Sequence, residues 1–359
     1  MNNLQKLSAQ FQQSPWLDNL SRDLLENGRI QEYVNDGIRG LTSNPTILEN
    51  AIKNSTKYDD QIKWFAGEGK STEEIYWSII EQDIKNATAI LRTIWDESNG
   101  ADGYVSLEVS PTLATDAAST LAQARKIWHD VDAPNLMIKV PATDEAIPVV
   151  KTLLSEGINV NVTLIFSIEH YRQVAEAHRS SHPQGTDNHA RSVASFFISR
   201  VDSEVDARLE AIGTDEALAL RGKAAISQAR LAYGVFLDTF AKTALIDGNS
   251  PAIQRLLWAS TSTKNPDYDD LLYVSELLAP MTINTLPEDT IAKIIDHLPE
   301  VARSFSLHDI EEAQSTLAAI TAAGVDLKDV ARTLESQGVQ KFQASFASLL
   351  DAIKSKAAA

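Results

Sequence analysis

The sequence contains no cysteine in its 359 residues, and this absence excludes disulfides, thiolate metal sites and cysteine nucleophiles. No run approaches the length of about 18 apolar residues that indicates a membrane-spanning helix. Residues 1–13 lack the apolar core of a signal peptide. No glycine-rich phosphate loop of the G-x-G-x-x-G or G-x-x-x-x-G-K-S/T type follows any expected strand. We therefore expect a cytoplasmic protein.

Positive charge is scarce as well. The chain has 32 lysines and arginines against 49 aspartates and glutamates, which gives a formal net charge of −17. Such a chain repels nucleic acids and anionic membranes, so we expect neither as a partner. It would also repel an anionic substrate at long range, although salt screens that field beyond about 10 Å. An anionic ligand would therefore depend on cations within its own site.

One short apolar segment, L-M-I-K-V-P-A-T at residues 136–143, contains a lysine. Pro134 and Pro141 bound this segment, so it cannot be the middle of a helix, and it is typical of a strand. A lysine inside a buried strand is costly unless it is paired or neutral. Lys139 is therefore either an edge-strand residue that extends to solvent or a desolvated amine able to attack a carbonyl and form a Schiff base.

Eight short apolar segments that are typical of strands alternate with segments that have the apolar spacing of helices. The expected strands are residues 15–18, 37–45, 103–111, 136–140, 160–166, 194–201, 255–260 and 281–285. The expected helices are residues 1–13, 20–35, 46–98, 116–131, 144–156, 168–178, 203–243, 271–279, 287–297, 310–323, 327–337 and 342–354. This alternation predicts an α/β fold, a closed (β/α)8 TIM barrel with additional helices, as one domain over residues 1–359. An open doubly wound sheet is the alternative, which the missing glycine-rich loops disfavour.

Polar side chains lie inside or directly after these strands. Glu108, Lys139, Asn161 and Thr163 interrupt otherwise apolar runs, and their alternation places them on the faces that we expect to point into the barrel. The other candidates lie in the end regions of strands: Asp18, Asn44, Ser195 with Arg200, and Ser260 or Ser262 with Lys264. Because barrel enzymes react at the C-terminal ends of their strands, these residues predict a site rather than a satisfied polar core.

The residue types indicate Schiff-base chemistry. A neutral Lys139 amine would attack a ketone and lose water, and the resulting iminium would accept electrons from the adjacent carbon–carbon bond. Asp18 is the candidate base for the neighbouring hydroxyl, and Glu108 would move protons through a water. Asn44 and Asn161 would hold substrate hydroxyls.

A phosphate site is expected on the sixth and seventh strands. Arg200 and Lys264, with Ser262, would clamp a phosphate. Arg200 is out of phase with Ser195 and Phe197, so we expect it beyond the end of its strand.

Six motifs together resemble the transaldolase family, in its long form with extra helices. They are T-S-N-P-T, V-S-L-E-V, M-I-K-V-P-A-T, V-N-V-T-L-I-F-S, S-F-F-I-S-R-V-D and S-T-S-T-K-N-P. Each motif is weak alone, whereas six in this order are very specific. The resemblance implies a barrel of the class I aldolase type without cofactor or metal, in which Lys139 forms the Schiff base.

The resemblance also implies a reaction with sugar phosphates. A dihydroxyacetone unit would move from sedoheptulose 7-phosphate or fructose 6-phosphate to glyceraldehyde 3-phosphate or erythrose 4-phosphate, in the non-oxidative pentose phosphate pathway. The family roles carry over to Asp18, Asn44, Glu108, Lys139, Asn161, Thr163, Ser195, Arg200 and Ser262. Many relatives place arginine where this chain has Lys264, and lysine lacks the bidentate fork. The oligomeric state stays open between monomer and homodimer.

Three alternatives remain. The first is a lyase similar to the fructose-6-phosphate aldolases, which have glutamine and tyrosine where this chain has Glu108 and Phe197. The second is an inactive sugar-phosphate-binding barrel, because a fold alone does not imply activity.

The third alternative is a metal site. His178 and His182 are four residues apart, with Glu176 and His189 nearby. Pro183 and the polar composition around it indicate a loop rather than a rigid ligand helix, so we expect no metal there.

Overall fold

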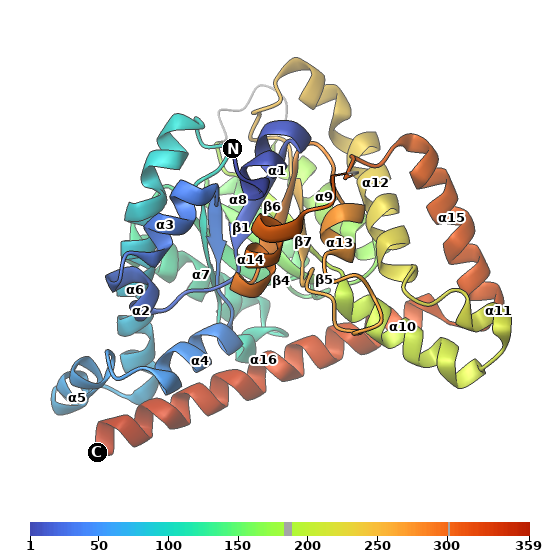
Figure 1. Cartoon of the computed structure of the whole chain (residues 1–359). Coiled ribbons are helices and arrows are strands. Elements are labelled where there is room, and N and C mark those ends of the chain that lie inside the picture. Colours follow the sequence, from blue (N-terminus) through green and yellow to red (C-terminus); the bar gives the residue numbers. More distant parts are fainter. Residues whose placement is uncertain (183–188, 301) are drawn as a thin grey trace.

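Eight parallel strands form a closed barrel in a computed structural model that describes residues 1–182, 189–300 and 302–359 (Figure 1). The strands are β1 (Gln13–Leu17), β2 (Gly40–Thr42), β3 (Val105–Glu108), β4 (Leu136–Pro141), β5 (Val160–Ile165), β6 (Ser192–Phe197), β7 (Arg255–Ala259) and β8 (Thr282–Leu286). Each strand pairs with the next, and β8 pairs with β1. The predicted (β/α)8 barrel is confirmed.

Helices surround the barrel and account for the extra length. They are α1 (Asn3–Phe11), α2 (Arg22–Glu26), α3 (Arg29–Asp36), α4 (Pro45–Asn54), α5 (Asp59–Gly67), α6 (Thr72–Glu97), the 3-10 turn η1 (Pro111–Leu113), α7 (Ala117–Val131), α8 (Ile147–Ser155), α9 (Ile168–Ser181), α10 (Ser199–Ile212), α11 (Asp215–Leu218), α12 (Ala224–Ile246), α13 (Leu272–Glu276), α14 (Glu288–His297), α15 (Leu307–Ala322) and α16 (Leu327–Ala358). In the part of the chain that the structure describes, no helix is long and apolar enough to cross a membrane.

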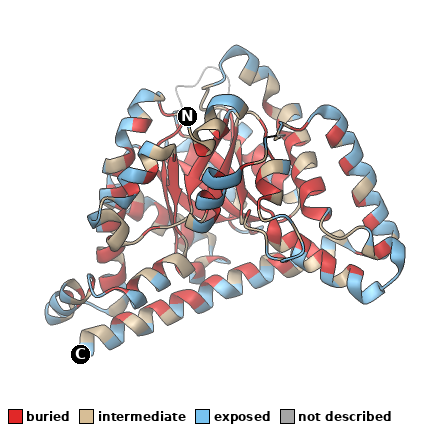
Figure 2. Ribbon diagram, viewed as in Figure 1, coloured by how far each residue is buried: buried red, intermediate tan, exposed pale blue. Residues whose placement is uncertain are grey.

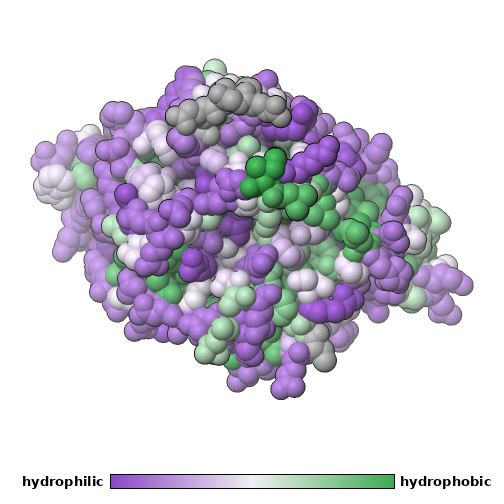
Figure 3. Space-filling model, turned by 90° about the horizontal axis from the view of Figure 1, so that it is seen from above, coloured by the Kyte–Doolittle hydropathy of each residue, from purple (hydrophilic) through white to green (hydrophobic). Residues whose placement is uncertain are grey.

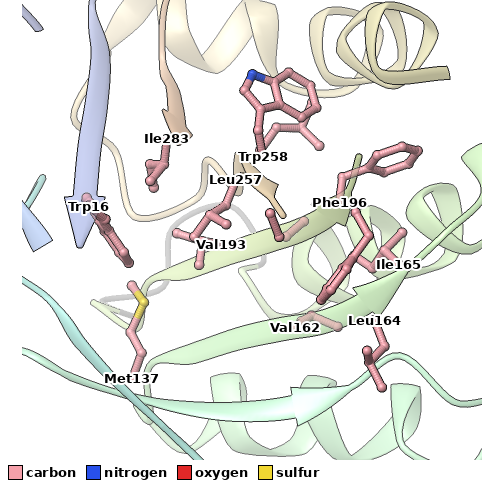
Figure 4. Packing of buried hydrophobic residues seen from close by; sticks show 14 of the residues in the cluster. Trp16, Met137, Val162, Leu164, Ile165, Val193, Phe196, Leu257, Trp258 and Ile283 are labelled. Carbon is pink, nitrogen blue, oxygen red and sulfur yellow. The ribbon is translucent and has the colours of Figure 1, made fainter. Parts of the chain in front are cut away.

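The barrel wall is buried on both faces, as an all-parallel sheet requires (Figure 2). Trp16, Met137, Val193 and Leu257 point toward one another in the barrel interior, whereas the Trp258 side chain points away from it (Figure 4). A Cβ atom on Gly40 would lie 2.4 Å from the Trp16 indole. Glycine is therefore required on β2 because the neighbouring indole occupies the space of a side chain.

The long helical stretches expected from the sequence are broken in the structure. Residues 46–98 form α4, α5 and α6, of which α6 begins at Thr72, where the Thr72-Glu73-Glu74 pattern predicts a helix start, and residues 203–243 fall on α10, α11 and α12. The expected helix over residues 20–35 is also two helices, α2 and α3, because Gly28 adopts a positive φ of 79°. Single-residue glycine turns of this kind do not disrupt the apolar spacing on either side, so the pattern alone joins the helices.

The expected helices over residues 327–337 and 342–354 are instead one helix, α16. Gly338 lies inside it, and a Cβ atom there would come within 3.0 Å of Leu164 Cδ2 and 3.7 Å of an Arg200 guanidinium nitrogen. A mid-helix glycine costs about 1 kcal/mol relative to alanine. Here it allows α16 to pass close to β5 and α10.

The two barrel mouths are covered by opposite ends of the chain. In Figure 1, α1 lies at the top, beside the N-terminal ends of the strands, and α16 runs along the lower edge, past their C-terminal ends. The C-terminal helix contacts α4, α5, α6, α10 and η1. It therefore closes one side of the mouth where a barrel enzyme would bind its substrate.

Candidate active site

A cavity of about 140 Å³ lies at the C-terminal ends of the strands. It is lined by Asp18, Thr42, Asn44, Lys139, Thr163, Ser195, Phe197, Arg200, Leu257, Ala259, Ser260, Ser262, Lys264, Thr285, Pro287 and Phe342. The structure thus brings the predicted site residues together around one cavity, except Glu108 and Asn161, which lie behind its wall.

Lys139 is buried in the centre of this site. Its Nζ lies 3.4 Å from Glu108 Oε2 and donates a hydrogen bond of 3.1 Å to the backbone oxygen of Ser43. Glu108 and Lys139 are opposite one another in the β3–β4 register. A closed barrel has no edge strand, and Lys139 is 5% exposed, so the reading as a lysine that extends to solvent is wrong.

Glu108 is a carboxyl group taken almost completely out of water. Burial raises its pKa, while Lys139 and Arg200 act in the opposite direction. A buried carboxyl with a raised pKa exchanges protons nearer neutral pH than an exposed glutamate does. Its position beside Lys139 lets it take a proton from the amine or return one.

Asp18 lies across the cavity, directly after β1. Its Oδ1 accepts a 2.8 Å hydrogen bond from Thr42 Oγ1, and its backbone N–H donates to Leu286 O at 2.9 Å. Burial raises the pKa of Asp18, and Lys139 is the largest opposing influence. The strand ends therefore hold two carboxyl groups near the amine, one in contact with it and one facing the cavity.

Asn161 forms a buried bridge beneath the cavity. Its Nδ2 donates to Ser106 Oγ at 3.0 Å, and its Oδ1 accepts from Ser195 Oγ at 2.7 Å. The amide lies opposite Lys139 in the β4–β5 register. It therefore fixes neighbouring side chains around the lysine, and Ser195 extends the bridge to the cavity wall.

Thr163 presents a hydroxyl group to the cavity. The residue is fully buried, and its Oγ1 has no hydrogen-bond partner among the described residues. An irregular register between Val162 and Ile165 follows at this point of β5, and Leu164 has a φ of 61°. An unpaired buried hydroxyl is costly, so a bound water or ligand group would complete it.

Two predicted residues are held by helices that begin at the mouth. Asn44 is the N-cap of α4, where its Oδ1 accepts from the Ile47 N–H at 3.0 Å. Ser262 Oγ lies 3.1 Å from Thr290 Oγ1 of α14. Both side chains line the cavity, and each is oriented by a contact on its far side.

The cavity mouth carries unpaired positive charge. Arg200 lies in the first turn of α10, beyond β6 as expected, and its guanidinium is 5.0 Å from the Phe197 ring centroid. Lys264 also lines the cavity. Within residues 1–182, 189–300 and 302–359, neither cation has a carboxylate at ion-pair distance. The mouth is therefore suited to an anionic group, despite the negative net charge.

The C-terminal helix supplies two residues that sequence reasoning missed. Phe342 lies 6.0 Å from both Lys139 Nζ and the Arg200 guanidinium, measured to its ring centroid. Burial, Arg200 and Lys264 lower the pKa of Lys341, which places a third cation near the mouth. A helical pattern indicates that Phe342 is buried but gives no sign of what it covers. Thr42 and Ser43, also missed, lie in the T-S-N-P-T motif.

His178 and His182 contact other parts of the protein. His178 is fully buried, with a pKa lowered to about 3 by burial and by His182. His182 Nε2 lies 2.8 Å from Ala190 O. No group of three or more metal-type side chains gathers in the described part of the chain. The loop expected around Pro183 lies mostly outside the described residues.

The sequence matches known proteins over almost its full length. The family described as Transaldolase/Fructose-6-phosphate aldolase matches residues 15–353. A protein named Transaldolase from Mycolicibacterium smegmatis is 45% identical, covering 94% of this chain and 93% of the relative. Relatives with the same name from Frankia alni (46%; 94% and 93% covered) and Thiobacillus denitrificans (45%; 97% and 99% covered) are equally similar. The chain belongs to the transaldolase/fructose-6-phosphate aldolase family.

Proposed function

We propose that this protein is a transaldolase that moves a dihydroxyacetone unit from a ketose phosphate to an aldose phosphate. The observation that carries this proposal is the buried Lys139–Glu108 pair, 3.4 Å apart, at the base of a cavity whose mouth bears unpaired cations. Curated relatives of 42–46% identity carry the name Transaldolase. The reaction belongs to the non-oxidative pentose phosphate pathway.

The first half of the reaction forms and uses the Schiff base. The neutral Lys139 amine attacks the ketone carbon, and Glu108 passes a proton through a water to the departing hydroxyl, so that water leaves and an iminium forms. Asp18 then removes the proton from the hydroxyl group next to the bond that breaks. The electron pair of that carbon–carbon bond then moves into the iminium. The bond breaks, the aldehyde part of the donor is released, and an enamine remains on Lys139.

The second half reverses these steps with another aldehyde. The enamine carbon attacks the acceptor aldehyde, and the new alkoxide takes its proton back from Asp18. Water then adds to the iminium, and the carbinolamine collapses to free Lys139 and the product ketose. The free hydroxyl of Thr163 is suited to hold this water, because it lies in the cavity without a protein partner.

Different residues of the cavity would bind the two ends of the substrate. Asn44 would hold donor hydroxyl groups directly, while Asn161 would act through Ser106 and Ser195, since both ends of its amide are occupied. The phosphate would bind Arg200, Lys264 and Ser262 at the mouth. Charge-assisted hydrogen bonds there would supply affinity that does not depend on the reacting atoms.

The competing reaction is simple cleavage, in which the enamine takes a proton from solvent. Phe197 favours transfer because its ring is apolar and lies in the cavity wall, 5.0 Å from the Phe166 ring. The fructose-6-phosphate aldolases, which resemble this family, have tyrosine at that position. Its hydroxyl group would help a water molecule to hydrolyse the enzyme-bound intermediate. Those aldolases have glutamine where this chain has Glu108, and this difference also favours transfer.

One assay distinguishes the two reactions. Release of glyceraldehyde 3-phosphate from fructose 6-phosphate is measured with and without erythrose 4-phosphate. We expect steady release that requires the acceptor. Comparable release without it would make the protein an aldolase and would contradict the proposed role of Phe197. No release in either condition would indicate an inactive sugar-phosphate-binding barrel.

We also propose that residues 1–359 form one domain and that the protein is cytoplasmic, as a monomer or homodimer. The continuous barrel and the helix α16, which packs on α4, α5, α6 and α10, support the single domain. Light scattering coupled to size-exclusion chromatography would give the oligomeric state. A single cooperative unfolding transition is expected for one domain.

A further inference from the structure

The opposite mouth of the barrel has a floor built around Arg255. This residue begins β7, and its guanidinium donates to Ser14 Oγ at 2.6 Å and to Asp102 Oδ1 at 3.2 Å. It also donates to backbone oxygens of Ala101, Met281 and Thr282. Its hydrogen-bonding capacity is therefore used within the protein.

Asp102 is the shared anion of this floor and is already occupied. It accepts hydrogen bonds from Ser14 Oγ at 2.7 Å and from Trp16 Nε1 at 3.2 Å, in addition to Arg255. Arg39 approaches it at 3.8 Å, which is too long for a hydrogen bond. The Asp102 carboxylate thus lies near two guanidinium groups, and it forms a hydrogen bond with Arg255 but not with Arg39.

Arg191 adds a third guanidinium without a carboxylate partner. Its side chain donates one long hydrogen bond of 3.5 Å to Asn99 O, and no acidic group of the described chain lies within ion-pair distance. Burial and the nearby Arg255 lower its pKa, while Tyr104, Asp247 and Asp102 act in the opposite direction. Among the residues that line this mouth, three arginines face one aspartate, so the lining carries two more positive than negative charges, although the net charge of the chain is −17.

These groups surround a cavity of about 420 Å³. The wall is completed by α1 and by the turn after α12, where Asn249 Oδ1 is buried without a hydrogen-bond partner among the described residues. Figure 3 views the molecule from this side and shows a central depression with mostly hydrophilic residues around it and a hydrophobic patch at one edge. The volume falls within the range of small-molecule sites, roughly 300–1,000 Å³.

We propose that this N-terminal mouth is a second binding site, for a small dianion of the phosphomonoester class that also carries a hydroxyl group. A phosphomonoester carries a charge of about −1.5 to −2 at neutral pH, which matches the two excess positive charges of the lining. Arg39 and Arg191 offer free forked donors, the geometry that recognises phosphate oxygens. Asn249 Oδ1 would accept a hydrogen bond from the hydroxyl group.

The site is independent of the reaction at the other mouth. None of its lining residues lines the cavity that contains Lys139. Binding can therefore be measured whether or not the proposed activity is found. Because phosphate would also bind Arg200, the test is made on full-length protein that carries Arg200→Ala, which weakens the active-site phosphate position.

Equilibrium dialysis with radiolabelled inorganic phosphate, displaced by glycerol 3-phosphate, tests the proposal. We expect the Arg200→Ala protein to bind one equivalent that unlabelled glycerol 3-phosphate displaces. Adding Arg39→Gln and Arg191→Gln should weaken this binding about tenfold or more, through loss of charge-assisted hydrogen bonds. Arg172→Gln, an exposed position on α9, is the matched control and should leave binding unchanged.

A milder variant keeps the test informative if the double substitution unfolds the chain. Arg191→Lys retains the charge but removes the fork, and we expect weaker binding with an unchanged circular dichroism spectrum. In the otherwise native chain, Arg39→Gln with Arg191→Gln should keep kcat and KM. Binding that is absent in the Arg200→Ala protein, or that survives all substitutions of Arg39 and Arg191, would overturn the proposal.

Discussion

The ring centroid of Phe342 lies 6.0 Å from Nζ of Lys139, although the two residues belong to distant parts of the chain. Phe342 is 3% exposed and belongs to α16, the helix that passes the C-terminal ends of the strands. An apolar ring at this point excludes water from the amine and from any enamine that forms on it. The C-terminal helix α16 therefore forms part of the wall of the cavity that contains Lys139.

Removing this ring should change how the intermediate is used. In Phe342→Ala we expect acceptor-independent release of glyceraldehyde 3-phosphate to rise several-fold relative to transfer, because water gains access to Lys139. The ratio of release without and with erythrose 4-phosphate measures the change. The substitution should also lower stability, by roughly 3–5 kcal/mol for loss of a buried phenylalanine.

A second phenylalanine on the same helix separates the two effects. Phe346 is equally buried, but its ring packs against Tyr76 at 5.2 Å and does not line the cavity. Phe346→Ala should lose similar stability and keep the ratio of the native protein. An equal rise of the ratio in both variants would mean that general loosening of α16 is responsible and that Phe342 has no special role.

Much of the site could be predicted because the strands follow simple rules. Polar residues in apolar strands are rare enough to be informative, and the two-residue period places Glu108, Lys139, Asn161 and Thr163 on one side of the wall. The same rule put Arg200 beyond its strand, and the structure confirms this position in the first turn of α10. Here the backbone period alone fixes where a side chain points.

Contacts between distant segments could not be predicted in this way. The occupied amide of Asn161 depends on Ser106 and Ser195, which reach it from neighbouring strands. The position of Phe342 depends on how α16 crosses the mouth, where Gly338 permits a close approach to Leu164. Such features follow from packing, which local spacing does not describe.

Substitution of the central lysine tests the Schiff base. Lys139→Met should abolish turnover, and borohydride should no longer trap a covalent adduct in the presence of fructose 6-phosphate. The fold should persist, because the raised pKa of Glu108 lets that carboxyl take a proton when its partner is removed. Lys151→Met, at an exposed position of α8, is the control and should behave like the native protein. Residual turnover with normal trapping would contradict the mechanism.

Lys264 offers a gain-of-function test. Lys264→Arg would restore a bidentate donor at the mouth, so we expect KM for fructose 6-phosphate to fall several-fold while kcat stays unchanged. The pattern reflects binding that is equal in the ground and transition states. Lys242→Arg, at an exposed position of α12, controls for the change of residue type. An unchanged KM would show that Lys264 does not contact the phosphate.

The buried carboxyl of Asp202 should make stability depend on pH. It lies on α10 and accepts hydrogen bonds from the Ala225 N–H at 2.8 Å and from Tyr273 Oη at 2.9 Å. Burial raises its pKa to about 6 from an ordinary value of 3.8. Between these values the folded state binds a proton that the unfolded state lacks, so this group lowers stability as pH rises from about 4 to 6.

Asp202→Asn removes the titration and keeps the shape of the side chain. The native protein should lose stability relative to this variant as pH rises across that interval, by up to about 3 kcal/mol, since one pKa unit corresponds to about 1.4 kcal/mol. Urea unfolding at a series of pH values measures the difference, and the comparison cancels the carboxyl groups that both proteins share. Asp267→Asn, at an exposed position, is the control for the change of residue type. A difference for Asp202→Asn that does not change with pH would mean that burial does not raise the pKa of the native carboxyl.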